Sequence, residues 1–433
     1  MDSYRATLER IYKLREGVID LRLERMERAL ALFDHPERRF AALHIAGTNG
    51  KGSTAAMVQR VLSLAGYRTA LYTSPHLVSF TERMRVGEAE ITETEVIALA
   101  EEVRRCCDGA AVPLTFFEFV TVMAFISFAR QKIDLAVVEV GLGGRLYATS
   151  VFTLLAAAIT TISKDNEAYL GTDELSIARE KGGIIKPGVP VVCGKVSAPV
   201  TRLLKSIAFE RGSVAYFLGE DFRFSLKNEG LFDYTGIKQH YANLAVGLRG
   251  RHQRANASVS LAILELVQER FPVDEKSLRA GLATVRWPGR LEVMLERPTV
   301  ILDGAHNSEG VHALVDELQT LRQGRRIKLL FAAMADKEWE LMLGVLAKVV
   351  DEVIFTRVKI ERSADPQQLA DKLKAAIPQR VFDDSRLGLQ TLLDESQADD
   401  LIVVAGSLYL LGEVRPMLQR LAAAQAANGQ SAN

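Results

Sequence analysis

The feature that most constrains the fold is a glycine-rich turn between a short apolar run and a helical pattern. Residues 41–46 form the apolar run, and Gly47-Thr48-Asn49-Gly50-Lys51-Gly52-Ser53-Thr54 follows it directly. From residue 54 to residue 65, apolar residues recur at helical spacing. A strand, a glycine turn and a helix in this order favour an α/β fold with a parallel sheet.

The same alternation of strand-like and helical patterns continues along the chain in two blocks. The first block adds apolar runs at residues 136–140 and 155–162 and helical patterns at 93–105 and 116–129. The second block has strand-like runs at residues 300–306, 328–334, 352–358, 380–384 and 401–407. Between the blocks, Trp287-Pro288-Gly289-Arg290 contains two residues that interrupt regular structure. We therefore predict a domain over residues 1–288 and a smaller α/β domain over residues 289–433.

The residue types in the glycine turn suit the binding of phosphate. Glycines let backbone amides approach phosphate oxygens, and the start of the following helix adds the positive end of its dipole. Lys51 supplies a cation and Ser53 an oxygen for magnesium. The spacing differs from the common G-x-x-x-x-G-K-[ST] pattern, because Gly52 separates the lysine from the serine. The alternative is a turn that serves only tight packing, but the lysine and serine favour a nucleotide.

Composition excludes several classes of function. Lysine plus arginine and aspartate plus glutamate both number 54. The chain therefore lacks the basic excess that is typical of proteins that bind nucleic acids. The N-terminal residues mix charges throughout, and no run of eighteen apolar residues follows, so we expect neither a signal peptide nor a membrane span. The three cysteines are too few for a disulfide framework. These observations favour a soluble, cytoplasmic protein.

Glu139 lies inside an apolar strand-like run just before a glycine turn. Burying an unpaired carboxylate is costly, so the residue needs a cation nearby. Two partners stay open, a bound metal ion and an ion pair with Arg145.

The turn Gly47–Ser53 resembles the GTNGKGS phosphate loop of the folylpolyglutamate synthase and dihydrofolate synthase branch of the Mur ligases. Further motifs of that branch occur in the same order and cover nearly the whole chain. They are Thr73–Leu77 with Glu82-Arg83, Thr115–Phe119, residues 135–150, Arg179–Ile184, His252–Ala257, Trp287–Glu292, Leu302–Asn307 and Ser407–Tyr409. The resemblance implies a P-loop-containing central domain with a parallel sheet and a smaller, Rossmann-like C-terminal domain.

The resemblance also implies roles for individual residues. Lys181 is at the position of a lysine that is often carbamylated and then carries a second metal ion. The other implied assignments are grouped here by role: ATP binding by Thr48, Asn49, Gly50, Lys51, Gly52, Ser53, Thr54, Asn256, Arg290 and Asp303; catalysis by Lys51, Lys181 and His306; substrate binding by Ser74, Pro75, His76, Arg83, Glu118 and Arg145; metal binding by Ser53, Glu139, Asn166 and Lys181.

The activity that the resemblance implies is ATP-dependent ligation of L-glutamate to dihydropteroate, to a reduced folate, or to both. The acceptor carboxylate attacks the γ-phosphate of ATP and forms an acyl phosphate, which the amine of glutamate then attacks. Lys51 and magnesium, with two ions expected, neutralise the charge of the transferring phosphoryl group. Relatives of this kind are commonly monomeric.

Four positions depart from the family pattern. Tyr147 replaces an aspartate, Ser150 an asparagine, Asn166 a metal-binding histidine, and Arg22 a glycine. An asparagine oxygen suits magnesium as a ligand. The changes at Tyr147 and Arg22 leave open a Mur-type ligase for another carboxylate acceptor. A nucleotide-binding paralogue with impaired catalysis is the other alternative, although Lys51 and its partner residues are intact.

Overall fold

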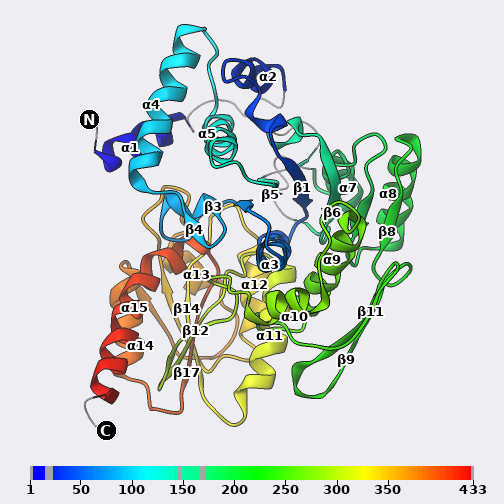
Figure 1. Cartoon of the computed structure of the whole chain (residues 1–433). Helices are drawn as coiled ribbons and strands as arrows, with labels where there is room; N and C mark the ends of the chain where they lie inside the picture. The colour runs from blue at the N-terminus through cyan, green and yellow to red at the C-terminus, as the bar shows by residue number, and fades with distance from the viewer. Residues whose placement is uncertain (1–2, 15–22, 142, 145–147, 165–170, 431–433) are drawn as a thin grey trace. The chain divides into compact units, whose positions relative to one another are not determined.

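The computed structural model describes residues 3–14, 23–141, 143–144, 148–164 and 171–430. The chain divides into two compact units, which are described separately below (Figure 1). The first unit contains Met1–Gly247 and Gln253–Arg286, and the second contains Leu248–His252 and Trp287–Asn433. The longer part of the second unit begins at Trp287, the first residue of the Trp287–Arg290 segment.

The first unit is built around an eight-stranded sheet in the order β4-β3-β2-β5-β1-β6-β7-β8. Six neighbouring strands, β2, β5, β1, β6, β7 and β8, run parallel, and β3 and β4 add an antiparallel edge. The three strands predicted in this half are confirmed as β1, β5 and β6. The bounds are β1 Ala41–Ala46, β2 Thr69–Tyr72, β3 Met84–Val86, β4 Ala89–Glu90, β5 Leu135–Glu139, β6 Leu154–Ile159, β7 Val191–Cys193 and β8 Ala215–Phe217.

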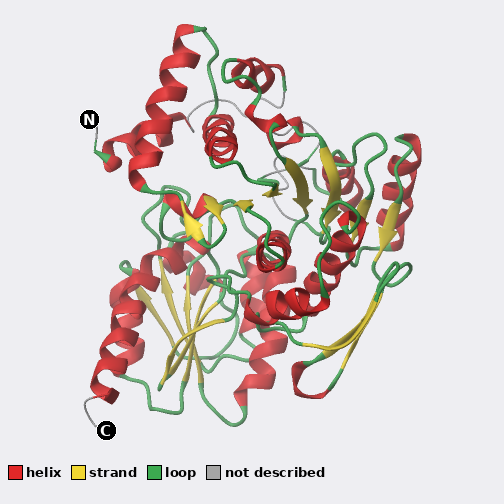
Figure 2. Ribbon diagram, in the orientation of Figure 1, coloured by secondary structure: helices red, strands yellow, loops and turns green. Residues whose placement is uncertain are grey.

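Helices and a small second sheet complete the first unit (Figure 2). The three predicted helices are confirmed as α3, α4 and α5, and α4 and α5 each begin at a threonine capping box. Three strands, β9 Arg223–Leu226, β10 Phe232–Thr235 and β11 His240–Leu244, form an antiparallel sheet. The helices are α1 Tyr4–Lys13, α2 Glu24–Ala31, α3 Lys51–Leu64, α4 Glu93–Gly109, α5 Phe116–Arg130, α7 Glu174–Gly182, α8 Ala198–Glu210, α9 His252–Val267 and α10 Glu275–Thr284.

Strand β1 lies in the centre of the first unit, and all six of its residues are buried. Ala42 belongs to a core cluster that includes residues of α4 and α5, whereas Ala46 belongs to a cluster with residues of α7 and α8. Helix α3 contacts β2 and β5. A strand covered in this way fixes the position of the turn that follows it.

The second unit contains a six-stranded sheet in the order β12-β13-β17-β14-β15-β16. All five strands predicted in this half are confirmed, and they run parallel. The sequence did not predict β12, which pairs antiparallel with β13. The bounds are β12 Glu292–Glu296, β13 Thr299–Leu302, β14 Ile327–Phe331, β15 Glu352–Thr356, β16 Gln379–Phe382, β17 Leu401–Ala405, α11 Ser308–Arg322, α12 Trp339–Leu346, α13 Pro366–Lys372, α14 Ser385–Asp394 and α15 Leu408–Gln430.

Two properties of the chain follow directly from these elements. Among the helices described, none has the length and apolar character needed to cross a membrane. The three cysteines are free thiols, with Cys107 and Cys193 buried.

Candidate functional site

The glycine turn joins the end of β1 to the first residue of α3, Lys51. Hydrogen bonding inside the helix begins with Thr54 N and the Gly50 carbonyl, at 2.9 Å. The amides of residues 51–53 therefore precede the first helical bond and sit at the positive end of the helix dipole. This geometry makes the turn a site for an anion such as phosphate.

Two glycines in the turn are required by close approach as well as by backbone conformation. Gly47 has φ 148° and Gly50 has φ 85°. A Cβ atom on Gly47 would lie 1.9 Å from Thr160 Oγ1, and one on Gly50 would lie 2.4 Å from Asn256 Oδ1. The structure thus brings Asn256, near the start of α9, directly against the turn.

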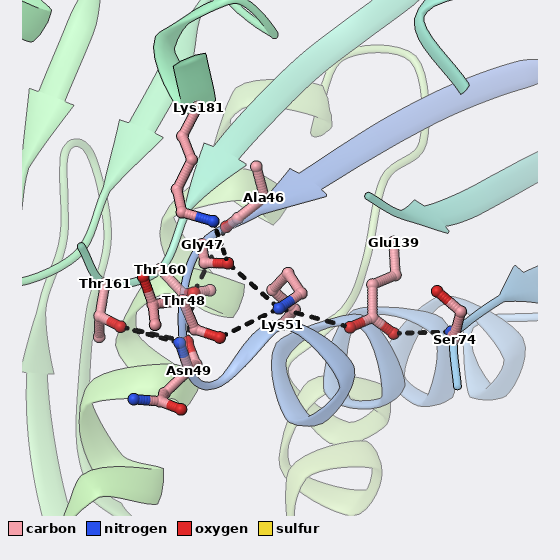
Figure 3. A network of polar contacts seen from close by, with 10 residues as sticks. All are labelled: Ala46, Gly47, Thr48, Asn49, Lys51, Ser74, Glu139, Thr160, Thr161 and Lys181. Atoms are coloured by element: carbon pink, nitrogen blue, oxygen red, sulfur yellow. Dashed lines mark hydrogen bonds and ion pairs between the residues drawn. The ribbon is translucent and has the colours of Figure 1, made fainter. Parts of the chain in front are cut away.

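Three ionisable side chains converge beside the turn (Figure 3). Lys51 Nζ donates to the carbonyls of Gly47, at 3.1 Å, and Thr48, at 3.0 Å, and lies 4.0 Å from Glu139 Oε1. Lys181 Nζ donates to the same Gly47 carbonyl at 2.9 Å. Glu139 and Lys181 are each 5% exposed. Among these three side chains, two ammonium groups stand against one carboxylate, a balance that suits a polyanion.

Ser53 and Thr54 are buried in the first turn of α3, at 1% and 0% exposure. Neither hydroxyl has a hydrogen-bond partner in the described part of the chain. Buried hydroxyls are rarely left unsatisfied, so the Ser53 hydroxyl is available for a metal ion or a phosphate group.

The turn after β2 places Ser74, Pro75 and His76 close to this region, with a cis peptide bond between Ser74 and Pro75. Ser74 N donates to Glu139 Oε2 at 3.2 Å. His76 Nδ1 accepts from Arg83 Nε at 2.8 Å, and this bond requires Nδ1 to be unprotonated. Tyr12 Oη lies 3.4 Å from His76 Nε2. Of the predicted substrate residues on this turn, Ser74 is therefore bonded to Glu139, and His76 is bonded to Arg83 and Tyr12.

Arg83 is buried among aromatic rings, with 2% exposure. Its guanidinium carbon lies 5.4 Å from the ring centre of Phe116 and 5.8 Å from that of Phe80. These distances allow cation–π contacts, which stabilise a cation that has left water. Tyr12 stacks on Phe116 at 5.9 Å. Tyr12 was not predicted as part of the site, because one tyrosine in an N-terminal helix carries no sequence signal.

Glu118 has structural partners for both of its carboxylate oxygens. Oε2 accepts from Thr115 N and Oγ1, which completes the capping box of α5. Oε1 pairs with Arg25 at 3.0 Å. Glu118 therefore anchors the start of α5 and holds α2 against it.

Asp303 lies in the second unit, just after β13. Its Oδ2 accepts from Leu291 N at 2.9 Å and its Oδ1 from Ala305 N at 3.0 Å. Leu291 has φ 47°, a left-handed conformation that is unusual for leucine. Asp303 thus holds the strained turn that follows Arg290.

Arg290 and His306 lie on either side of Asp303 in the sequence. Arg290 Nη1 donates to the Gly289 carbonyl at 3.2 Å. His306 Nδ1 donates to the Gly304 carbonyl at 2.8 Å, so Nε2 is the acceptor when the ring is neutral. A Cβ atom on Gly304 would lie 2.2 Å from Arg290 Nη1, so the arginine side chain passes close to this residue.

Some predicted residues cannot be placed. Arg145 and Asn166 lie outside the described residues, as do two of the departures from the family pattern, Arg22 and Tyr147. Their assignments stay predictions.

Comparison with known protein families identifies the class of the chain. Residues 45–264 match the family model of the Mur ligase middle domain, and residues 289–408 match that of the Mur ligase glutamate ligase domain. The phosphate turn lies in the first match and the Arg290–His306 region in the second. The fold and the turn together are those of a Mur ligase.

Individual relatives narrow this class. The dihydrofolate synthase/folylpolyglutamate synthase of Bacillus subtilis is 32% identical over 418 residues, which cover 92% of this chain and 95% of the relative. The structure of E. coli FolC in complex with DHPP and ADP matches with a TM-score of 0.89 and 29% identity, and covers 97% of this chain and 98% of the other. The Yersinia pestis enzyme, complexed with AMPPNP and a Mn ion, matches with a TM-score of 0.88 and 30% identity, covering 96% and 98%. The chain belongs to the dihydrofolate synthase/folylpolyglutamate synthase family.

Proposed function

We propose that this protein is an ATP-dependent ligase that joins L-glutamate to dihydropteroate, to a reduced folate, or to both. The observation that carries the proposal is the convergence of Lys51, Glu139 and Lys181 on a glycine turn at the start of α3. The names of the relatives supply the substrate class.

The turn supports the first half-reaction. The amides of residues 51–53 and the Lys51 ammonium receive the triphosphate, and Lys51 exchanges its two carbonyl partners for phosphate oxygens. A carboxylate oxygen of the acceptor then forms a bond to the γ-phosphorus while the bond to the β-phosphate oxygen breaks. The products are an acyl phosphate and ADP.

The second half-reaction forms the amide. The amine of glutamate attacks the acyl carbon, the bond from that carbon to the phosphate oxygen breaks, and the nitrogen loses a proton. Phosphate is a far better leaving group than oxide, which is why the first step is needed. In the C-terminal domain we assign Arg290 and Asp303 to the binding of ATP and His306 to catalysis, with Asp303 also holding the Arg290 turn.

The residues beside the turn fit a magnesium ion. Magnesium prefers oxygen ligands, commonly one or two protein oxygens together with phosphates and water. The unpartnered Ser53 hydroxyl and the buried Glu139 carboxylate supply such oxygens. When bound, the ion offsets charge on the transferring phosphoryl group. We assign a second ion to Lys181 after carbamylation and to Asn166.

The proposal also covers the setting of the enzyme. We expect a cytoplasmic monomer that acts on small molecules, with the Ser74–Arg83 region near the acceptor and no nucleic acid or membrane partner. Equal numbers of basic and acidic residues, 54 each, are consistent with this expectation.

One assay separates this proposal from its alternatives. Purified protein with ATP, magnesium and L-glutamate is scored for ADP release with dihydropteroate, with tetrahydrofolate, or with no acceptor. Release that requires a pterin supports the proposal. If no ADP is released with either pterin but a different acid restores release, the protein is a Mur-type ligase for another carboxylate.

Lys51→Ala tests the role of the turn within that assay. We expect kcat to fall by at least about a hundredfold, because the lysine neutralises charge that develops in the transition state. Lys205→Ala removes a lysine that is 48% exposed and paired with Glu220 at the surface, and it should leave turnover unchanged. Equal rates for both variants and the unmodified protein would remove Lys51 from the mechanism.

A further inference from the structure

Two threonines beside the phosphate turn have no role in the assignments above. Thr160 and Thr161 follow β6, which pairs in parallel with β1, so both residues lie at the same sheet edge as the turn. Thr160 is 2% exposed. Figure 3 shows both side chains directed toward Asn49 from the side opposite Lys51.

The two hydroxyls hold both backbone polar groups of Asn49. Asn49 N donates to Thr161 Oγ1 at 3.0 Å, and Thr160 Oγ1 donates to the Asn49 carbonyl at 2.5 Å. The backbone adds a third bond, from Thr48 N to the Thr161 carbonyl at 2.8 Å. Residues 48 and 49 of the turn are therefore attached to the end of β6.

These bonds decide which amides of the turn face a ligand. The Asn49 amide is directed to Thr161, so it faces the sheet. Fixing the Asn49 carbonyl also fixes the plane of the next peptide, which leads into the left-handed conformation of Gly50 at φ 85°. The amides of residues 51–53 then point outward from the start of α3. A site arranged before the ligand arrives binds it more tightly, because no ordering cost falls on binding.

We propose that Thr161, with Thr160, is a positioning residue that orients the phosphate turn for the triphosphate. The threonines act through the backbone of Asn49. This inference deepens the proposed function and rests on it.

The test compares nucleotide binding by variants of one hydroxyl. Thr161→Val removes the acceptor of the Asn49 amide and keeps the branched shape, whereas Thr161→Ser restores a hydroxyl. Thr121→Val is the matched control, since Thr121 Oγ1 lies 3.0 Å from Tyr72 Oη in the buried core of the same unit. The dissociation constant of ADP with magnesium is measured by calorimetry, and the thermal midpoint by circular dichroism.

We expect Thr161→Val to weaken ADP binding about tenfold, the effect of losing one well-formed hydrogen bond. Thr161→Ser and Thr121→Val should stay within about threefold of the unmodified protein, although Thr121→Val should lower the thermal midpoint as much as Thr161→Val does. If Thr161→Val binds ADP as tightly as Thr121→Val does, the threonine is only structural and the inference fails.

A second measurement needs no variant and covers the case in which Thr161→Val does not fold. Hydrogen exchange of the unmodified, ligand-free protein should show the Asn49 amide protected, because Thr161 holds it. Rapid exchange at Asn49 would overturn the inference. Protection at Asn49 in a protein that binds no ADP would instead overturn the proposed function and leave the arrangement of the turn intact.

Discussion

Individual side chains show which parts of the site the sequence could predict. Lys51 was predicted from its position in a glycine turn, and Glu139 from the cost of burying a carboxylate. Their mutual approach to 4.0 Å could not be predicted, because it depends on the spacing of β1 and β5 in the sheet. Thr160 and Thr161 escaped prediction because threonine at the end of a strand is common and its partner here is backbone.

His44 provides a prediction for the dependence of stability on pH. The side chain is fully buried in β1, its Nε2 bonds Thr149 Oγ1 at 2.8 Å, and its Nδ1 has no partner among the described residues. Burial, with a smaller contribution from Lys186, lowers the pKa of His44 to about 3.

The lowered pKa of His44 determines how the stability of the fold changes with pH. Between pH 6.5 and 3, the unfolded chain binds a proton at His44 that the folded chain does not, so stability is complete above pH 6.5 and falls below it. From pH 6.5 to 5 the loss should be about 2 kcal/mol. Urea titrations at both pH values should show a shallower loss for His44→Gln. Equal losses for variant and unmodified protein would mean that His44 titrates normally.

Single strands and helices were predicted best where they are long or strongly apolar. The five parallel strands of the second unit and the three buried strands of the first are each clear in the sequence. Strands β7 and β8 span only three residues each, which is too short for a period to show. Helix α3 begins at Lys51, three residues before the predicted start, because Gly52 continues the helix although glycine has a low helical propensity.

A buried ion pair between β14 and the residue just before β17 should matter for stability. Lys328 Nζ lies 3.1 Å from Asp400 Oδ2, and the side chains are only 3% and 7% exposed. Lys328→Met leaves the aspartate buried without its cation, which should cost about 3–5 kcal/mol. Denaturant unfolding of the second unit measures this change.

The control for that ion pair is Lys372→Met. Lys372 pairs with Glu340 at 3.1 Å, but the side chains are 53% and 50% exposed. Water screens such a pair, so the loss should be below about 1 kcal/mol. Similar losses for the two variants would show that burial does not set the strength of the Lys328 pair.

The whole molecule shows why the order of motifs identified the family and yet left the site incomplete. Residues predicted to bind ATP occur in both units, with Lys51 in the first and Arg290 in the second. The sequence fixes their order along the chain, and the structure adds the local network of each. The structure also shows contacts that no motif predicts, such as the hydrogen bond by which Asp303 holds the turn after Arg290.

The account rests on transfer of the γ-phosphoryl group to the acceptor carboxylate. Its most direct test uses dihydropteroate or tetrahydrofolate labelled with oxygen-18 in the reacting carboxylate, with ATP, magnesium and L-glutamate. Mass spectrometry of the released phosphate should find one labelled oxygen per turnover, because that oxygen leaves with the phosphate when the amide forms. Turnover that yields unlabelled phosphate, or no turnover with either acceptor, would contradict the account.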